Sequence, residues 1–330
     1  MDVIEQGVGR IFTDPDADKA REFFRHKSRA LVSKLTTVKE AVTKYVQDGD
    51  YVSIGGFGVN RISAAVLHEI VRQGKKNLGL AGHTATHDFE ILSAGKCFNR
   101  CDVAYIIGLE ARGLSPNARQ YMESGEVEVC EWTNYTLAVR YKAACAGVSF
   151  HPIRNMMGTD TFKYSGAKMV KCPFTGTNYA LVPALFSDVG LLHVHEADIY
   201  GNCRTKGILM SDYDLARSSK KVIVTCERLI TNDEIRRDPT STFIPYWCVD
   251  AVIEQPFGSY PGNMYGEYFS DEEHLREWLK VENDPEEFKK FLDKNIYSCK
   301  DHYEYIEKNG GMNKMLKLRQ KEWLMIGARE

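Results

Sequence analysis

Residues 51–61 read YVSIGGFGVNR, a short apolar run that ends in a cluster of glycines. The run predicts a β-strand, and Gly55, Gly56, Phe57 and Gly58 after it predict a tight loop. In an open α/β sheet, ligands bind at the carboxyl ends of the strands, and glycines let backbone N–H groups approach a ligand oxygen. We therefore expect this loop to bind a carbonyl or carboxylate oxygen. A turn with a purely structural role is the alternative.

The spacing of these glycines argues against a nucleotide-phosphate site. A dinucleotide fold requires G-x-G-x-x-G, and a P-loop requires G-x-x-x-x-G-K-[ST]. The run here is G-G-F-G, followed by Val59, Asn60 and Arg61, and it matches neither pattern.

From residue 37 onward, helix-like and strand-like segments alternate. Thr37 with Glu40 three positions later is the pattern of a capping box, which predicts a helix start. Helices are expected over 37–49, 63–74, 88–95, 117–125, 136–147 and 213–220, and strands over 51–56, 78–82, 102–108, 126–132, 188–198, 221–229 and 248–256. This order predicts an α/β fold with an open, mostly parallel sheet and helices on both faces.

The segments outside this alternation define the expected domain organisation. Residues 1–36 are an N-terminal extension, either an amphipathic helix docked on the surface or on a partner, or a frayed arm. Residues 37–330 form the α/β domain. Within that domain we expect an irregular or β-rich insertion at about 148–180, where prolines and glycines interrupt the periodicity, and a helical tail at about 270–330.

Composition and charge exclude several classes of protein. The 330 residues carry a net charge of −2, so no global field attracts nucleic acid. No apolar run approaches the roughly 18 residues that span a membrane, and the acidic N-terminus is unlike a signal peptide. We expect a cytoplasmic protein that binds neither nucleic acid nor a membrane.

The histidines and cysteines do not predict a metal site. The nine cysteines include no CxxC pair and are interpreted as reduced thiols. His83 and His87 would share one face of a helix, and His193 and His195 one face of a strand, but neither pair has a third ligand at a useful spacing. We expect ordinary hydrogen-bonded histidines, no metal and no tightly bound cofactor.

Two further strand ends carry polar residues. Gly82, His83 and Thr84 follow the strand expected over 78–82. Asp198, Gly201 and Asn202 form a structural turn after the strand over 188–198, in which Asp198 accepts from turn amides and Asn202 tolerates left-handed backbone geometry.

The carboxylates near strand ends are candidates for catalysis. Glu110 follows an expected strand and is the candidate catalytic residue, and Glu131 and Glu227 lie in similar places. No G-x-S-x-G elbow occurs, so a serine hydrolase of that type is not indicated. No residue is an unmistakable nucleophile.

Several longer motifs together resemble the α subunit of family I CoA-transferases of the glutaconate CoA-transferase type. In chain order over roughly 37–310 they are VSIGGFGVNR, HVHEADIYGN, KKVIVTCERLITNDEIRRDPT, IPYWCVDAVIEQPFGSYPGNMYGEY and DHYEYIEKNGG. The chain departs from the family pattern at Gly258–Pro261 and in the loop 82–88, where substrate specificity would be set. A dicarboxylic or aromatic acid other than glutaconate therefore stays open as the substrate.

The resemblance implies an enzyme that moves CoA from an acyl-CoA to a free acid, with acyl-CoA and CoA as its substrates. The nucleophilic glutamate, which forms a glutamyl-CoA thioester, belongs to a β subunit, so the chain would be one half of an α2β2 or α4β4 assembly. The resemblance implies that Arg61 pairs with a substrate carboxylate. It places the substrate-binding residues in two loops: Gly55, Gly56, Phe57, Gly58, Asn60, Arg61, Gly82, His83 and Thr84.

Two alternatives keep parts of this interpretation. The same fold acting as an acyl-CoA hydrolase or decarboxylase would use Glu110 or His83 as the base. A module that binds an acyl-CoA or carboxylate without catalysis would need no partner.

Overall fold

A parallel sheet forms the centre of the molecule. The computed structural model describes residues 2–106 and 112–327. Strands pair in the order β12-β11-β9-β2-β3-β4-β5, all parallel, and β10 adds an antiparallel partner to β9. The strands are β2 (Tyr51–Ile54), β3 (Leu78–Gly82), β4 (Phe98–Val103), β5 (Glu128–Glu131), β9 (Ser187–Ala197), β10 (Cys203–Arg204), β11 (Ser219–Leu229) and β12 (Ala251–Glu254). The predicted open, mostly parallel sheet is confirmed.

The middle of this sheet is a topological switch point. From β2 the chain moves outward through β3 and β4 to β5, then returns to β9 on the other side of β2 and moves outward to β12. Val52 pairs with Val189 and Ile54 with Leu191 at the junction. Ligands of open α/β sheets bind outside the carboxyl ends of the strands at such a point.

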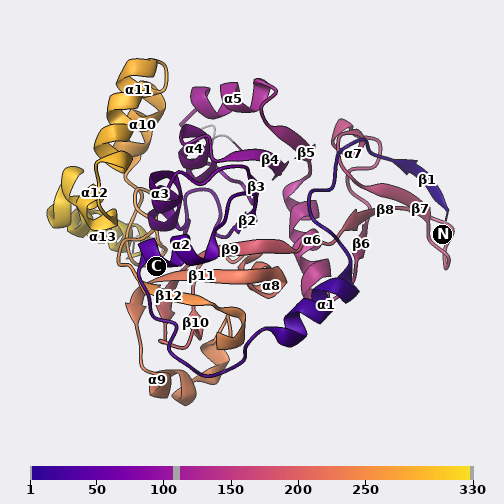
Figure 1. Cartoon of the computed structure of the whole chain (residues 1–330), viewed down its shortest axis with the longest axis horizontal. Helices are drawn as coiled ribbons and strands as arrows, with labels where there is room; N and C mark the ends of the chain where they lie inside the picture. The colour runs from indigo at the N-terminus through magenta and orange to yellow at the C-terminus, as the bar shows by residue number, and fades with distance from the viewer. Residues whose placement is uncertain (1, 107–111, 328–330) are drawn as a thin grey trace.

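Helices cover both faces of the sheet (Figure 1). Side chains alternate between the faces along each strand, so that Leu191 joins one hydrophobic cluster and Leu192 the other. One face is covered by α2 (Val38–Tyr45), α3 (Ala64–Arg72), α4 (His87–Ala94) and α5 (Pro116–Glu123), and the other by α6 (Asn134–Ala146) and α8 (Asp212–Ser218). The capping box of Thr37 and Glu40 starts α2, as predicted.

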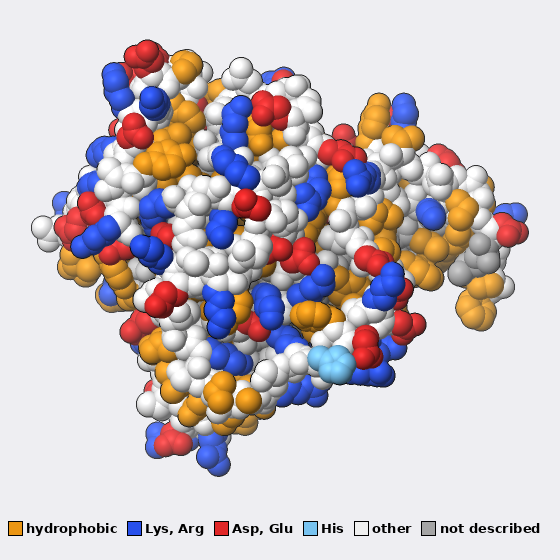
Figure 2. All heavy atoms as spheres, in the orientation of Figure 1, with side chains coloured by type: hydrophobic (Ala, Val, Ile, Leu, Met, Phe, Trp, Pro, Cys, Tyr) orange, Lys and Arg blue, Asp and Glu red, His pale blue; other side chains and the backbone are white. Residues whose placement is uncertain are grey.

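The predicted β-rich insertion is a small antiparallel sheet. Its strands are β6 (Phe150–Ile153), β7 (Lys168–Lys171) and β8 (Asn178–Pro183), and the short α7 (Asp160–Lys163) lies between β6 and β7 in the chain. The fourth strand, β1 (Val3–Gln6), comes from the N-terminal segment and pairs with β7. The sheet projects from one side of the body, and hydrophobic side chains lie on the projection (Figure 2).

The N-terminal segment docks along the body of the molecule. Helix α1 (Ala17–His26) packs Ala17, Ala20 and Phe24 against α6 and the end of β8. Beyond α1, Leu35 forms a parallel bridge with Val252 at the sheet edge. Of the two alternatives for residues 1–36, the structure shows the docked helix.

The remaining helices follow β11 and β12. Helix α9 (Asn232–Arg237) and two 3₁₀ turns (Pro239–Ser241 and Tyr246–Cys248) precede β12. The predicted helical tail comprises α10 (Glu272–Val281), α11 (Pro285–Leu292), a π-helical turn (Asp293–Tyr297), α12 (His302–Lys308) and α13 (Gly311–Gly327). In the described part of the chain, no helix has the length and apolar character that crossing a membrane requires.

One predicted strand was misplaced. The strand expected over 102–108 runs instead over Phe98–Val103, and residues 107–111 lie outside the described part of the chain. Asn99 and Arg100 interrupt the apolar pattern because their side chains reach solvent while Phe98 and Cys101 are buried.

Candidate substrate site at the carboxyl edge of the sheet

The loop after β2 is a tight turn that depends on glycine. Gly56 and Gly58 have φ values of +89° and +64°. The backbones of Phe57 and Asn60 exchange two hydrogen bonds of 2.9 Å. A Cβ atom on Gly55 would lie 2.3 Å from Leu192 Cδ2, so this glycine permits close packing of the loop on β9.

The backbone amides of this loop already have acceptors within the chain. Gly55 N–H donates to Leu191 O (2.9 Å), Phe57 N–H to Asn60 O (2.9 Å) and Gly58 N–H to Thr84 O (3.0 Å). Gly56 N–H donates to Asp212 Oδ1 (3.1 Å). The expectation that these amides bind a ligand oxygen therefore does not hold for the chain in this conformation. The glycines provide shape and close approach.

Left-handed backbone recurs at three adjacent strand ends. Arg61, Thr84 and Tyr105, after β2, β3 and β4, have φ values of 60°, 43° and 60°. Isolated bridges join the loops to one another, Gly58 with Ala85 and Ala85 with Ile106. Non-glycine residues in this region are uncommon, and they cluster at functional sites where the surrounding structure holds them.

Arg61 forms a buried ion pair that joins the first loop to α8. Its Nη1 lies 2.9 Å from Asp212 Oδ1 and its Nη2 3.0 Å from Asp212 Oδ2, and both side chains are buried. Burial alone would raise the pKa of Asp212, but the Arg61 guanidinium and the Gly56 amide outweigh it and lower this pKa below its ordinary value. The carboxylate that Arg61 meets here is the protein's own. Its predicted pairing with a substrate carboxylate stays a prediction.

The second loop is also tied to α8. His83 Nε2 lies 2.8 Å from Ser211 Oγ, and His83 Nδ1 is buried without a hydrogen-bond partner. Burial lowers the pKa of His83 to about 4, so the imidazole is neutral at neutral pH. Asn134 holds the neighbouring Thr84 by accepting from its amide (3.3 Å) and donating to its hydroxyl (3.0 Å). Gly82 ends β3 directly before this pair.

A second buried carboxylate of this edge, Glu227, is fully engaged. It accepts from Tyr268 Oη (2.8 Å) and Phe257 N (2.8 Å), and its Oε1 lies 2.7 Å from His193 Nε2. Burial would raise the pKa of Glu227, but its contacts with His193 and the other donors lower it overall. This group fixes strand ends and has no free oxygen directed at a ligand.

The histidine pairs serve as hydrogen-bonding groups. His193 and His195 lie on β9 and meet Glu227 and Tyr265 O, respectively. His83 and His87 do not share a helix face, because α4 begins only at His87, which meets Glu90 at 2.7 Å. Within residues 2–106 and 112–327, no three His, Cys, Asp or Glu side chains are placed to hold a metal ion.

Comparison with known proteins identifies the family. A family model described as Coenzyme A transferase matches residues 35–255. The alpha-type polypeptide of glutaconate CoA-transferase from Acidaminococcus fermentans is 33% identical over 304 residues, which cover 84% of this chain and 92% of that polypeptide. The chain belongs to the coenzyme A transferase family. Within it, the chain is of the alpha-subunit type.

Solved structures and a second relative agree with this CoA-transferase assignment. The crystal structure of glutaconate coenzyme A-transferase from Acidaminococcus fermentans matches with a TM-score of 0.83 and 32% identity, covering 87% of this chain and 96% of that chain. The corresponding polypeptide of 3-oxoadipate CoA-transferase from Pseudomonas knackmussii is 33% identical over 84% of this chain and 98% of its own length. A cysteine-to-serine variant of the decarboxylase AibA/AibB matches with a TM-score of 0.72 and 29% identity, covering 80% and 98%.

Two other predicted positions of the CoA-transferase chain lie away from these loops or outside the described residues. Asp198 Oδ1 accepts from the amides of Tyr200, Gly201 and Asn202 at 2.9–3.0 Å. Gly201, with φ +100°, takes the left-handed conformation that was expected for Asn202. Glu110, the candidate catalytic residue, lies in 107–111, outside the described part of the chain.

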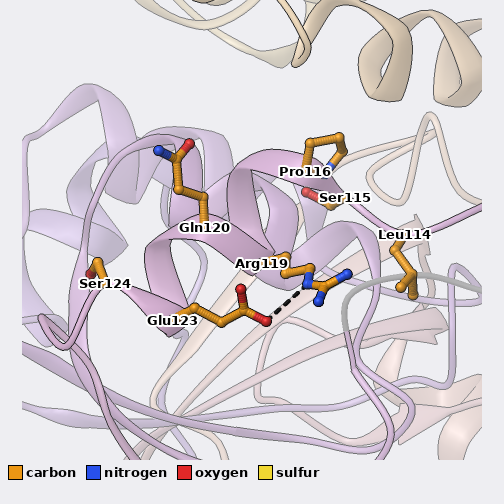
Figure 3. A pocket seen from close by; sticks show the side chains of 7 residues that line it. All are labelled: Leu114, Ser115, Pro116, Arg119, Gln120, Glu123 and Ser124. Carbon is orange, nitrogen blue, oxygen red and sulfur yellow. Dashed lines mark hydrogen bonds and ion pairs between the residues drawn. The ribbon is translucent and has the colours of Figure 1, made fainter.

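A surface hollow against α5 does not belong to the substrate loops of this CoA-transferase chain. It encloses about 560 Å³ and is lined by Leu114, Ser115, Pro116, Arg119, Gln120, Glu123 and Ser124 (Figure 3). Arg119 Nε pairs with Glu123 Oε1 at 2.9 Å, and the Ser115 hydroxyl caps α5. The charged groups of the hollow thus already have partners.

Proposed function

We propose that this chain is the α subunit of a hetero-oligomeric enzyme that moves CoA from an acyl-CoA to a free dicarboxylic acid. The named relatives support this substrate class, since glutaconate and 3-oxoadipate are both dicarboxylic acids. The partner is a β subunit that carries the nucleophilic glutamate, in an α2β2 or α4β4 assembly located in the cytoplasm.

The proposed reaction is a two-stage exchange with no external reductant or oxidant. The partner's glutamate carboxylate attacks the thioester carbonyl, giving an acyl-glutamyl anhydride and CoA thiolate. The thiolate attacks the glutamyl carbonyl, which releases the first carboxylate and leaves a glutamyl-CoA thioester. The acceptor carboxylate then repeats the two steps in reverse order, taking the CoA and restoring the glutamate.

One observation carries the proposal of a partner-borne nucleophile. Asp212 and Glu227, two buried carboxylates at this edge of the sheet, are both held as acceptors by hydrogen bonds and charged neighbours. A carboxylate so held is a weak nucleophile, because its lone pairs are engaged and its pKa is lowered. In this proposal the two glycine loops shape the pocket against which the partner's glutamate approaches.

A decarboxylase or hydrolase is the second candidate function, supported by the structural match to the decarboxylase AibA/AibB. His83 would be the base within the described residues, since its imidazole is neutral and Nδ1 has no partner. Glu110 is the other candidate for that role.

CoA transfer by the assembled enzyme distinguishes these functions. The chain is co-expressed with its partner, and labelled acyl-CoA and a panel of dicarboxylic acids are supplied. We expect CoA to move to an acid, and replacement of the partner's glutamate by alanine to abolish transfer. Free CoA or CO₂ formed without a new acyl-CoA, unaffected by that replacement, would support the second candidate and overturn the first. His83→Gln then tests the base.

A further inference from the structure

The residues that open α8 contact both substrate loops. Asp212 accepts from Gly56 N–H at 3.1 Å and pairs with Arg61 at 2.9 Å, which fixes the first loop. The preceding Ser211 meets His83 of the second loop at 2.8 Å. Two adjacent residues therefore determine how the loops after β2 and β3 sit relative to each other.

The segment leading into these residues is apolar and exposed. The exposed fractions of Ile208, Leu209 and Met210 are 53%, 38% and 43%. Arg61 Nη2 donates to Ile208 O at 2.5 Å, so the same guanidinium that pairs with Asp212 also holds this segment. Gly207, with φ +84°, turns the chain into it.

We propose that residues 207–212 couple docking of the partner subunit to the geometry of the two substrate loops. The inference rests on the proposed function, in which the partner's glutamate must reach the first loop. A partner that comes this close covers Ile208–Met210, because Arg61 connects Ile208 directly to that loop. Burial of three apolar side chains favours association, as the hydrophobic effect requires.

Ser211 and Asp212 act in this proposal as positioning residues. Both are buried, with exposed fractions of 4% and 2%, so they act on the substrate through the loops they hold. Asp212 carries the larger share, since its carboxylate accepts from the first loop's amide and from the guanidinium that binds Ile208 O.

The docking half of the proposal is tested by titrating the partner against Leu209→Ser. Loss of one buried leucine contact should raise the partner concentration for half-maximal assembly by about tenfold. Phe174→Ser is the matched control, because Phe174 is 93% exposed and lies on the projecting small sheet, away from the loops. Equal affinity of the Leu209→Ser variant and the wild type would overturn this half.

The positioning half is tested with Asp212→Asn in the assembled enzyme. We expect kcat to fall by about tenfold or more, as for loss of a hydrogen bond to a charged group, while KM for acyl-CoA changes less. Asp212→Glu should restore part of kcat. The control is Asp102→Asn, an equally buried carboxylate that pairs with Arg140 at 2.6 Å. If both variants lower kcat only in proportion to lost folded protein, Asp212 has a structural role alone and the proposal is wrong.

Hydrogen exchange separates this proposal from the proposed function. Partner binding should slow amide exchange in residues 54–62 and 82–86 of the wild type, and Asp212→Asn should remove that protection. This readout needs no turnover. Protection in the wild type together with absent CoA transfer would overturn the proposed function and keep the coupling. Transfer without any protection in these loops would overturn the coupling.

Discussion

Replacing Gly56 by alanine tests whether the loop after β2 needs glycine for both its conformation and its packing. Gly56 has φ +89°, and an added Cβ would lie 2.5 Å from Asn60 O and 2.9 Å from the carbonyl carbon of Arg61. Both neighbours are backbone atoms, which cannot rotate away as a side chain can. The substitution should therefore be costly for two independent reasons.

Gly49 provides a matched control for the backbone term. Its φ is +88°, and no atom lies within 4 Å of an added Cβ. Gly49→Ala should cost about 1–2 kcal/mol for the left-handed conformation alone. Gly56→Ala should add about 1–3 kcal/mol for overpacking. The gain from restricting the unfolded chain is common to both variants and cancels in their difference.

Urea unfolding of the two variants measures this difference. We expect equal slopes and a lower midpoint for Gly56→Ala, with a stability difference from Gly49→Ala of about 1–3 kcal/mol. Two variants of equal stability would show that the loop moves freely to accept a side chain. That result would refute close packing as the reason for the glycine.

Two further substitutions test buried charged groups. Asp102→Asn leaves the buried Arg140 guanidinium without its ion-pair partner, and urea unfolding should show a loss of about 3–5 kcal/mol; a loss below about 1 kcal/mol would contradict this. Glu90→Gln should change how stability depends on pH, because burial raises the pKa of Glu90 from 4.5 to about 8. The folded wild type holds that proton more tightly than the unfolded chain, so its stability should decline as pH rises from about 5 to 8. The variant, which lacks the proton, should escape this decline in melting experiments, and parallel curves would show that Glu90 does not titrate.

The main sheet could be predicted because its signals are local. Buried parallel strands such as β2 and β11 are short apolar runs, and capping residues such as Thr37 mark helix starts. Strand β1 could not be predicted, since all four of its residues are exposed and its partner β7 lies far along the chain. Tertiary pairing creates that strand.

The position of the substrate loops could be predicted, but the use of their polar groups could not. Glycines after β2 and β3 mark the carboxyl edge of the sheet. The acceptor of Gly56 N–H, however, is Asp212, which lies 156 positions later in the chain. No local pattern in SDYD distinguishes that aspartate from a solvated helix start, so the occupied amides and the buried Arg61 pair appear only in the folded chain.

Mass spectrometry of both polypeptides after incubation with acyl-CoA tests the central claim most directly. The account predicts a covalent CoA thioester on a glutamate of the partner subunit, with this chain unmodified, and loss of the adduct when an acceptor acid is added. A CoA adduct on a carboxylate of this chain, or CoA transfer by this chain alone, would contradict it.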